Sequence, residues 1–257
     1  MVDLKGFHPE LALDNFSRLD GTIVFFSFVK AAIKRTNAKR VMDFGAGRGQ
    51  CFHDAGLPGA SLFKLELMDL RTEGSEVWAA DIDPVVRTHP ASHHQVIIPS
   101  DGRLPFEDNF FDVIASDVTF EHVANPETVA SELIRVLRPG GYICARTPSK
   151  YGYVSIATRL VPNRHHVAAL RHIAPDKQAR DIFPTRFLMN SVRDIKRLFH
   201  PCDVYWYRDS AGPSYFFNNR LLYRLFLGLH KILPNSLATS LCLFIRKPEA
   251  GLPDQTA

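Results

Sequence analysis

The stretch VMDFGAGRGQ, residues 41–50, decides the fold of this chain. An apolar strand here runs into the acid Asp43 and then into three glycines at alternate positions, Gly45, Gly47 and Gly49. Glycine is needed where the backbone takes a positive φ or approaches a ligand too closely for a Cβ, and open α/β sheets bind ligands at the carboxyl ends of parallel strands. The stretch predicts a nucleoside-cofactor turn, with a tight strand-to-helix connection as the alternative.

The spacing of the glycines separates two kinds of cofactor. A dinucleotide fingerprint, G-x-G-x-x-G, needs a third glycine at position 50, where this chain has Gln50. The observed D-x-G-x-G-x-G pattern resembles motif I of the class I methyltransferases that use S-adenosylmethionine. The resemblance implies S-adenosylmethionine as the cofactor, bound by Asp43, Gly45, Ala46, Gly47 and Gly49.

A second acid follows a second apolar strand in VWAADIDP, residues 77–84. A carboxylate at the carboxyl end of a strand, here Asp81, can accept hydrogen bonds from both hydroxyls of a ribose. The family resemblance implies this role for Asp81 and implies that Ile82 packs against the adenine. The alternative is structural, with Asp81 as a helix N-cap and Asp83-Pro84 as an ordinary helix start.

Residues 100–148 are similar to the second half of the same cofactor domain. The pattern predicts a buried strand over 111–116, a helix over 126–137 that stops at Arg138-Pro-Gly-Gly141, and a strand over 142–146. The resemblance places Asp101, with Gly102 beside it, at the adenine amine, whereas a plain Asp-Gly turn is the alternative. Residues after the strand would face the methionine part of the cofactor and the acceptor, namely Asp117, Val118, Glu121 and His122.

These segments together predict an α/β, Rossmann-like three-layer methyltransferase fold. Its sheet would have seven mostly parallel strands, an antiparallel last strand and helical insertions in the C-terminal part. We expect residues 1–149 to form the cofactor-binding core with its N-terminal helix, residues 150–250 to supply acceptor-binding elements and the closing strands of the same domain, and residues 251–257 to be a flexible tail.

Further elements are predicted along the chain. We expect an opening helix over 19–36 with Asp20 as its cap, a strand over 93–98, and a helix that begins at Asn190 or Ser191. The chain between Gly49 and Asp81 is longer than one crossover needs, which predicts an added loop before the helix. The closing hairpin would consist of strands over 203–207 and 241–246 with a helix over 219–233 between them.

Composition fits an intracellular globular enzyme, because 46% of the residues are hydrophobic and 23% are charged. No basic leader with an apolar core and no long uncharged apolar run is present, so we expect a cytoplasmic protein. The four cysteines lie far apart and are expected to be reduced. His89 and His93 are four residues apart but lack an accompanying carboxylate pattern, so no metal site is expected.

The charge is distributed unevenly along the chain. Up to residue 149 there are 15 Lys and Arg against 20 Asp and Glu, and beyond it 16 against 7. A basic acceptor-binding part favours anionic partners, and Arg146 and Arg164 are candidates to bind them, although a solvated surface explains the charge equally well. Nucleic acid is not expected, because the chain lacks an uninterrupted basic run and an aromatic RNA-binding motif.

The helix over 219–233 has a broad apolar face flanked by Arg220, Arg224, His230 and Lys231. Such a helix can pack on its own domain, form a homodimer contact or lie on the acidic inner face of a membrane. The sequence favours packing on its own domain and leaves the other two possibilities open.

The expected chemistry follows from the cofactor. A sulfonium methyl is already activated, so the protein must hold the nucleophile in line and exclude water, and a hydroxyl acceptor gains from a nearby base. The candidates for that base are His122, Glu121, His165 and His166. The sequence predicts methylation of a small-molecule, sugar or lipid-linked acceptor, with oxygen favoured over nitrogen. A non-catalytic cofactor-binding protein is the alternative, and a nicotinamide oxidoreductase is disfavoured by Gln50.

Overall fold

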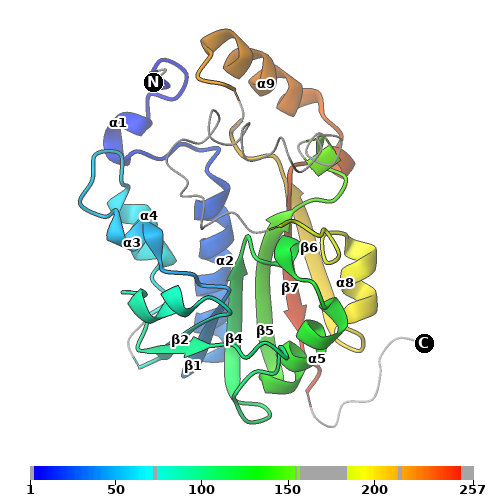
Figure 1. Ribbon diagram of the computed structural model, residues 1–257. Helices are drawn as coiled ribbons and strands as arrows, with labels where there is room; N and C mark the ends of the chain where they lie inside the picture. Colours follow the sequence, from blue (N-terminus) through cyan, green and yellow to red (C-terminus); the bar gives the residue numbers. More distant parts are fainter. Residues whose placement is uncertain (1–2, 72–73, 154, 157–183, 214–215, 250–257) are drawn as a thin grey trace.

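We analysed the protein as a computed structural model, which describes residues 3–71, 74–153, 155–156, 184–213 and 216–249 (Figure 1). The strands are β1 (Arg40–Phe44), β2 (Glu76–Asp81), β3 (His94–Ile97), β4 (Phe111–Asp117), β5 (Leu137–Pro148), β6 (Asp203–Asp209) and β7 (Ser240–Arg246). The helices are α1 (Leu11–Asp14), α2 (Gly21–Thr36), α3 (Gln50–His53), α4 (Leu62–Met68), α5 (Pro126–Val136), α8 (Val192–Leu198) and α9 (Arg220–Ile232), with short 3₁₀ turns η1 (Pro84–Thr88), η2 (Phe120–His122) and η4 (Asn235–Leu237).

The seven strands form one sheet in the order β3-β2-β1-β4-β5-β7-β6. β1 pairs in parallel with β2 and β4, and the parallel pairing continues to β3 on one side and β5 on the other. β7 is antiparallel to both of its neighbours, β5 and β6. The predicted fold class, including the antiparallel last strand and the helical insertion before it, is therefore confirmed.

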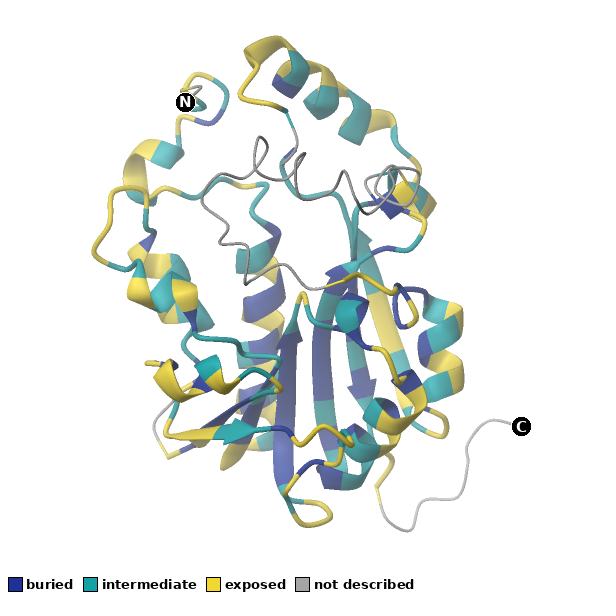
Figure 2. Cartoon of the chain, viewed as in Figure 1, coloured by how far each residue is buried: buried dark blue, intermediate teal, exposed yellow. Residues whose placement is uncertain are grey.

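Two apolar clusters cover the two faces of the sheet. Alternate residues of a strand point to opposite faces, so Val41 of β1 joins the cluster with Phe25 and Val29 of α2, whereas its neighbour Met42 joins the cluster with Leu133 of α5. The first cluster also packs against α4, and the second includes α8. Helix, sheet and helix thus form the three predicted layers, with the most buried strands in the middle (Figure 2).

The element boundaries follow local signals with one clear exception. Asp20 caps α2 by accepting a hydrogen bond from the N–H of Thr22, and Ser191, one of the two candidates, caps α8 through the N–H of Asp194. β5, however, begins at Leu137, the last residue of the predicted helix, rather than at Tyr142, because Leu137 pairs with Phe111 across an irregular register. Tertiary pairing here extends a strand through a segment that looks locally like a turn.

The added loop predicted between Gly49 and Asp81 is present. α3 and the turn after it precede α4, whose N-cap Ser61 accepts from the N–H of Lys64. The Asp14 carboxylate in turn accepts hydrogen bonds from the Ser61 hydroxyl and from the N–H groups of Leu62 and Phe63. The insertion is therefore tied to the N-terminal segment, beside the carboxyl ends of the strands.

Candidate active site

The glycine turn is held against the neighbouring strands. Gly45, Gly47 and Gly49 have φ of +76°, +55° and +66°, which side chains disfavour. The N–H of Gly45 donates to the carbonyl of Ala80 in β2 at 2.7 Å. A Cβ on Gly45 would lie 2.2 Å from Oγ1 of Thr119, so this glycine is required by packing inside the protein.

Gly47 has a different environment from the other two glycines. A Cβ on Gly49 would meet the His89 ring at 2.8 Å, whereas a Cβ on Gly47 would meet nothing within 4 Å. The N–H of Gly47 donates to Oδ2 of Asp81 at 2.8 Å. Open space above a glycine backbone, next to a carboxylate, is what close approach of a ligand requires.

Asp81 lies at the carboxyl end of β2, as predicted. Its Oδ1 accepts from the N–H of Asp83 at 2.8 Å, and burial raises the pKa of the carboxyl against the lowering effect of these hydrogen bonds. Asp83, and not Asp81, is the N-cap of η1, through the N–H of Val85. The alternative reading of Asp81 as a helix cap is therefore wrong. Ile82 beside it is 63% exposed and free to contact a ligand.

Three acids gather at the carboxyl ends of β1, β2 and β4. Burial, together with the charges of Asp117 and Asp81, raises the pKa of Asp43 to about 7. His89 lies 3.9 Å from Asp43, but burial lowers the pKa of His89 to about 4, so the imidazole is neutral at pH 7. His89 therefore does not balance the charge of Asp43.

Asp117 and Arg146 form a two-point ion pair at the ends of β4 and β5. Nε of Arg146 lies 2.6 Å from Oδ1 of Asp117, and its second terminal nitrogen lies 2.7 Å from Oδ2. The remaining nitrogen is 3.2 Å from Oγ1 of Thr22. Arg146 is thus engaged within the protein, which removes it as the predicted ligand for an anionic acceptor.

Val118 follows this ion pair in an unusual conformation. Its φ is +57°, uncommon for a β-branched residue, and its N–H donates to the carbonyl of Arg146 at 2.8 Å. Strained backbone of this kind is concentrated at functional sites. The side chain is 47% exposed, in the position that the family resemblance gives to a cofactor contact.

Asp101 and Gly102 form a turn outside this group of acids. The N–H of Arg103 donates to Oδ1 of Asp101 at 3.0 Å, and Gly102 has a φ of +78°. This is the Asp-Gly turn given as the alternative interpretation. Asp101 is nevertheless exposed, so its carboxylate can still reach a ligand, and the adenine contact stays a prediction.

The candidate bases are in different environments. Glu121 is 2% exposed and accepts from Oγ1 of Thr147 at 3.0 Å, and Thr147 in turn accepts from Nδ2 of Asn190 at 2.6 Å. Burial raises the pKa of Glu121. The buried carboxyl links β5 to the segment before α8, and its role as a base stays a prediction.

His122 lies at the edge of the site. Its Nδ1 is 3.3 Å from the carbonyl of Pro184 and its Nε2 is 3.8 Å from Oε1 of Glu121. With 30% of its side chain exposed it remains accessible, and its role as a base stays a prediction. His165 and His166, and likewise Arg164, lie outside the described residues.

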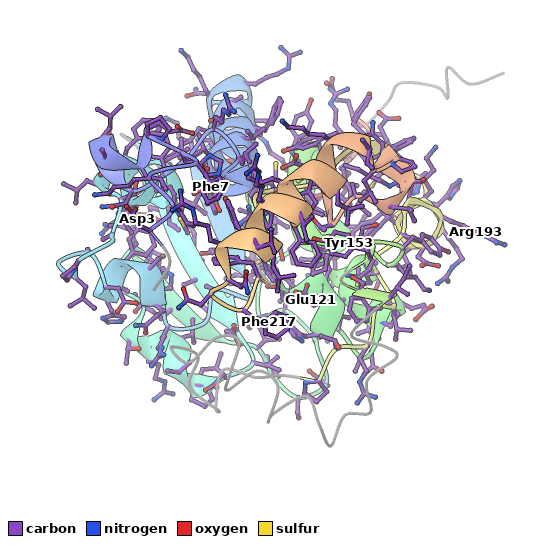
Figure 3. The ribbon with its side chains drawn as sticks, turned by 90° about the horizontal axis from the view of Figure 1, so that it is seen from above. Asp3, Phe7, Glu121, Tyr153, Arg193 and Phe217 are labelled. Carbon is purple, nitrogen blue, oxygen red and sulfur yellow. The ribbon has the colours of Figure 1, made fainter. Side chains whose placement is uncertain are left out.

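A cavity of about 210 Å³ lies beside Val118. It is lined from the ends of β4 and β5, from the start of β7 and from α9, and its lining includes Val118, Thr147, Pro148, Tyr153, His230 and Ser240. The Tyr153 hydroxyl lies 2.8 Å from Nε2 of His230 (Figure 3, which labels Tyr153 next to α9). Sequence reasoning missed this pair because its members are 77 residues apart, and no local motif joins them.

The described residues contain no group of three His, Cys, Asp or Glu side chains arranged to hold a metal ion. His93 accepts a hydrogen bond on Nδ1 from the N–H of Val77 at 3.0 Å, so this side chain connects the start of β3 to β2.

Comparisons with known proteins agree with the geometry. Residues 42–145 match the family model described as a methyltransferase domain. An uncharacterized methyltransferase of Mycolicibacterium gilvum is 34% identical over 104 residues, 39% of this chain and 36% of that protein. One of Schizosaccharomyces pombe is 41% identical over 44 residues, 17% of this chain and 16% of that protein. The chain thus spans about a third or less of these curated relatives.

Solved structures match over more of the chain. A Haloferax volcanii methyltransferase in complex with the Trm112 methyltransferase activator has a TM-score of 0.52 and 17% identity, over 88% of this chain and 90% of its own. The plantazolicin methyltransferase BamL, in complex with a desmethyl analogue and S-adenosylhomocysteine, has the same TM-score and identity over 89% and 85%. Residues 42–145 are therefore similar to a methyltransferase domain, and the fold of the chain is similar to that of these solved methyltransferases.

Proposed function

We propose that the protein transfers a methyl group from S-adenosylmethionine to a small-molecule, sugar or lipid-linked acceptor, with oxygen as the favoured target. The observation that carries this proposal is the open backbone at Gly47 beside the carboxylate of Asp81. Gln50 argues against a dinucleotide cofactor, because it stands where the dinucleotide pattern needs its third glycine.

The residues present fit the adenosyl and methionyl parts of the cofactor. A side chain at Gly47 would fill the space above the turn, the carboxylate of Asp81 suits a ribose, and the exposed Ile82 offers an apolar surface for the adenine. We assign the cofactor contacts to Asp43, Gly45, Ala46, Gly47, Gly49, Asp81, Ile82, Asp101, Gly102, Asp117 and Val118.

The bound cofactor would supply an activated methyl group, and the protein would supply position and a dry environment. The ion pair between Asp117 and Arg146 fixes the end of β4, next to Val118 at the wall of the cavity. The acceptor would approach from the cavity, because the part of its lining beyond residue 149, including Tyr153 and His230, belongs to the elements expected to bind the acceptor. His122 stays a candidate base.

Calorimetric titration tests the cofactor assignment. We expect S-adenosylhomocysteine to bind and NAD not to bind. Asp81→Asn should weaken S-adenosylhomocysteine binding by about 10-fold or more, because the two ribose hydroxyls lose a charged acceptor. Asp83→Asn is the matched control, since Asp83 caps η1, and it should leave the affinity nearly unchanged. Tight binding of NAD, or equal affinity of wild type and Asp81→Asn, would contradict the proposal.

We also propose where the protein is located and which contacts α9 makes. We place the protein in the cytoplasm, with peripheral contact at the inner membrane face and homodimer formation as further possibilities through α9. No helix in the described part of the chain is long and apolar enough to cross a membrane. Leu221, Leu225 and Ile232 of α9 are exposed, which supports a contact surface. Failure to float with anionic vesicles would remove the membrane contact, and a monomer in sedimentation would remove the dimer.

A partner protein is a separate proposal. The Haloferax volcanii methyltransferase with the same fold is held in a complex with an activator. Co-purification from the native host would test whether this chain also has a protein partner.

A further inference from the structure

A second cavity, of about 560 Å³, lies at the opposite edge of the sheet from the glycine turn, where β5 begins and β7 ends (lower edge of the sheet in Figure 1). Its volume is in the range of small-ligand pockets. Tyr142 in its wall precedes Arg146 on β5 by four residues, which at 3.3 Å per residue is roughly 13 Å. The cavity shares no residue with the candidate active site, and its lining includes Arg35, Thr36, Arg138, Tyr142, Arg246 and Glu249.

Three elements bring arginines to this cavity. Tyr142 and Arg246 are paired across β5 and β7, so their side chains lie on the same face of the sheet. Tyr142 packs in the apolar cluster that contains α2, which identifies this face. A terminal nitrogen of Arg138 donates to the carbonyl of Thr36, the last residue of α2, at 2.7 Å. The end of α2, the start of β5 and the end of β7 thus place Arg35, Arg138 and Arg246 around one space.

The positive charge of this lining exceeds its negative charge. Nε of Arg138 lies 2.8 Å from Oδ1 of Asp112, a buried acid behind the cavity wall. Arg246 pairs with Glu249, the one acid in the lining. Arg35 is exposed and makes neither a hydrogen bond nor an ion pair with any residue that the structure describes. One guanidinium is therefore available to a ligand without breaking any contact of the protein.

The guanidinium of Arg246 is only half used. In the ion pair of Arg146 with Asp117, Nε and one terminal nitrogen each contact a carboxylate oxygen. Arg246 gives the corresponding terminal nitrogen to Glu249, but its buried Nε has no acceptor in the described part of the chain. An unmet donor of this kind costs folding free energy, and an anion that binds both nitrogens would remove that cost. The Glu249 side chain is 54% exposed, so its carboxylate can turn into solvent and make way for such an anion.

We propose that this cavity binds a ligand with a terminal phosphate monoester. A monoester carries about −1.5 to −2 charges at pH 7 and three acceptor oxygens, and its geometry matches the guanidinium fork. It would contact Arg35 and take the place of Glu249 on Arg246. A single carboxylate would only repeat what Glu249 already supplies. The inference goes beyond the proposed methyl transfer and does not rest on it, because the two sites have no residue in common.

Two ligands of the same shape test the preference for a doubly charged anion. We would titrate the protein by calorimetry at pH 8 with phenyl phosphate and with phenyl sulfate, which has the same three terminal oxygens but a single charge. We expect phenyl phosphate to bind at least about fivefold more tightly, because the second charge strengthens every contact with an arginine. Equal affinities, or no detectable binding of either compound, would overturn the proposal.

Two variants of the lining should change this affinity in opposite directions. Arg35→Gln removes the unpaired guanidinium and should weaken phenyl phosphate binding by about fivefold or more. Glu249→Gln removes the competing carboxylate from Arg246 and should strengthen binding by about twofold or more. Both side chains are exposed, so we expect both variants to fold, which circular dichroism checks.

Matched controls come from an exposed ion pair elsewhere in the chain and from an exposed arginine on the other face. Glu127 pairs with Arg197 between α5 and α8, and Arg193 lies on α8 (labelled in Figure 3). Glu127→Gln and Arg193→Gln should each change the affinity for phenyl phosphate by less than about twofold. Controls that change the affinity as much as Arg35→Gln and Glu249→Gln would show a general effect of net charge and overturn the site.

Competition separates this site from the cofactor edge. Saturating S-adenosylhomocysteine should leave the affinity for phenyl phosphate within about twofold, since the sites are at opposite edges of the sheet. Loss of phenyl phosphate binding under these conditions would place the anion at the cofactor edge and overturn the proposal. Failure of S-adenosylhomocysteine itself to bind would contradict the proposed function and leave the phosphate site standing.

Two further measurements identify the source of the phosphate. Vesicles with phosphatidic acid present a monoester headgroup, so flotation of wild type but not of Arg35→Gln would assign the site to a lipid. Binding of phenyl phosphate without flotation would assign it to a soluble molecule. A single-stranded oligonucleotide without terminal phosphates contains only diesters. If it bound more tightly than phenyl phosphate and depended on Arg35, the surface would be a nucleic-acid contact and the proposal would be wrong.

Discussion

At the residue scale, the three glycines of the turn serve different purposes, and two substitutions separate them. Gly45→Ala places a Cβ 2.2 Å from Thr119 at a φ of +76°, so we expect a loss of about 2–4 kcal/mol in the free energy of unfolding. Gly47→Ala meets nothing and should cost only about 1 kcal/mol of backbone strain, but it should weaken S-adenosylhomocysteine binding by about 10-fold or more. Urea unfolding and calorimetry measure the two effects.

The opposite ranking would contradict this division of roles. If Gly47→Ala were the less stable variant, or if it bound the cofactor normally, the open space above Gly47 would not be the ligand site.

Asp43 gives a second prediction at this scale. Its folded-state pKa of about 7 lies above the ordinary value of 3.8, so folding favours the protonated form. The stability that this group contributes is fully present below pH 3.8 and is lost as the pH rises to about 7. Asp43→Asn removes this titration, so the variant should match wild type in stability near pH 4 and be more stable at pH 8. The difference between their free energies of unfolding should grow by at most about 1.4 kcal/mol per pH unit.

Urea unfolding at pH 4, 6 and 8 measures the difference in free energy of unfolding between Asp43→Asn and wild type. Asp101→Asn, on an exposed turn, is the control for loss of one acid. A gap for Asp43→Asn that does not widen with pH would mean that the Asp43 carboxyl is not destabilised by burial and by its acidic neighbours.

At the element scale, Tyr223 and Arg220 attach α9 to the N-terminal segment, and Arg220 lies over the ring of Phe7. Tyr223 is 3% exposed, its hydroxyl lies 2.7 Å from Nε2 of the buried His8, and its ring contacts Phe7 and Phe216. Tyr223→Phe keeps the ring but leaves His8 without this partner, so we expect a loss of about 1–2 kcal/mol in the free energy of unfolding. Tyr205→Phe, on an exposed position of β6, should change it by less than about 0.5 kcal/mol.

Urea unfolding of both variants checks this attachment. Equal losses in the two variants would show that the hydrogen bond to His8 contributes nothing beyond ordinary removal of a hydroxyl. The same helix carries His230, so the attachment also positions the cavity wall.

At the scale of the whole molecule, the cofactor core and the acceptor elements share one sheet. β5 of the first part pairs with β7 of the second over seven residue pairs, from Tyr142 with Arg246 to Pro148 with Ser240. We therefore expect a single cooperative unfolding transition. The fluorescence of the two tryptophans reports on unfolding of the two parts separately, because Trp78 lies in β2 and Trp206 in β6.

Single-tryptophan variants measure this directly. Trp78→Phe and Trp206→Phe each leave one fluorescent probe, and within either variant the fluorescence and circular dichroism midpoints in urea should coincide. Separate midpoints would divide the chain at residue 149 into two independently folding units.

Much of the fold was predictable because its signals are local. Continuous apolar runs mark β1, β2 and β4 as buried parallel strands, and the glycines and acids that follow them mark the carboxyl edge of the sheet. Capping residues such as Asp20 and Ser191 fix helix starts within a residue. The start of β5 was not predictable, because it depends on pairing with Phe111, 26 residues earlier in the chain.

The sequence alone determined the cofactor edge of this protein, because the glycine turn and the acid at 81 lie within short stretches whose backbone conformation is set by neighbouring residues. Only the tertiary structure decided the use of individual side chains. It paired Asp117 with Arg146, buried Glu121 against Thr147, and joined Tyr153 to His230 across 77 residues. Such contacts depend on distances between remote segments, and periodicity and spacing carry no information on those distances.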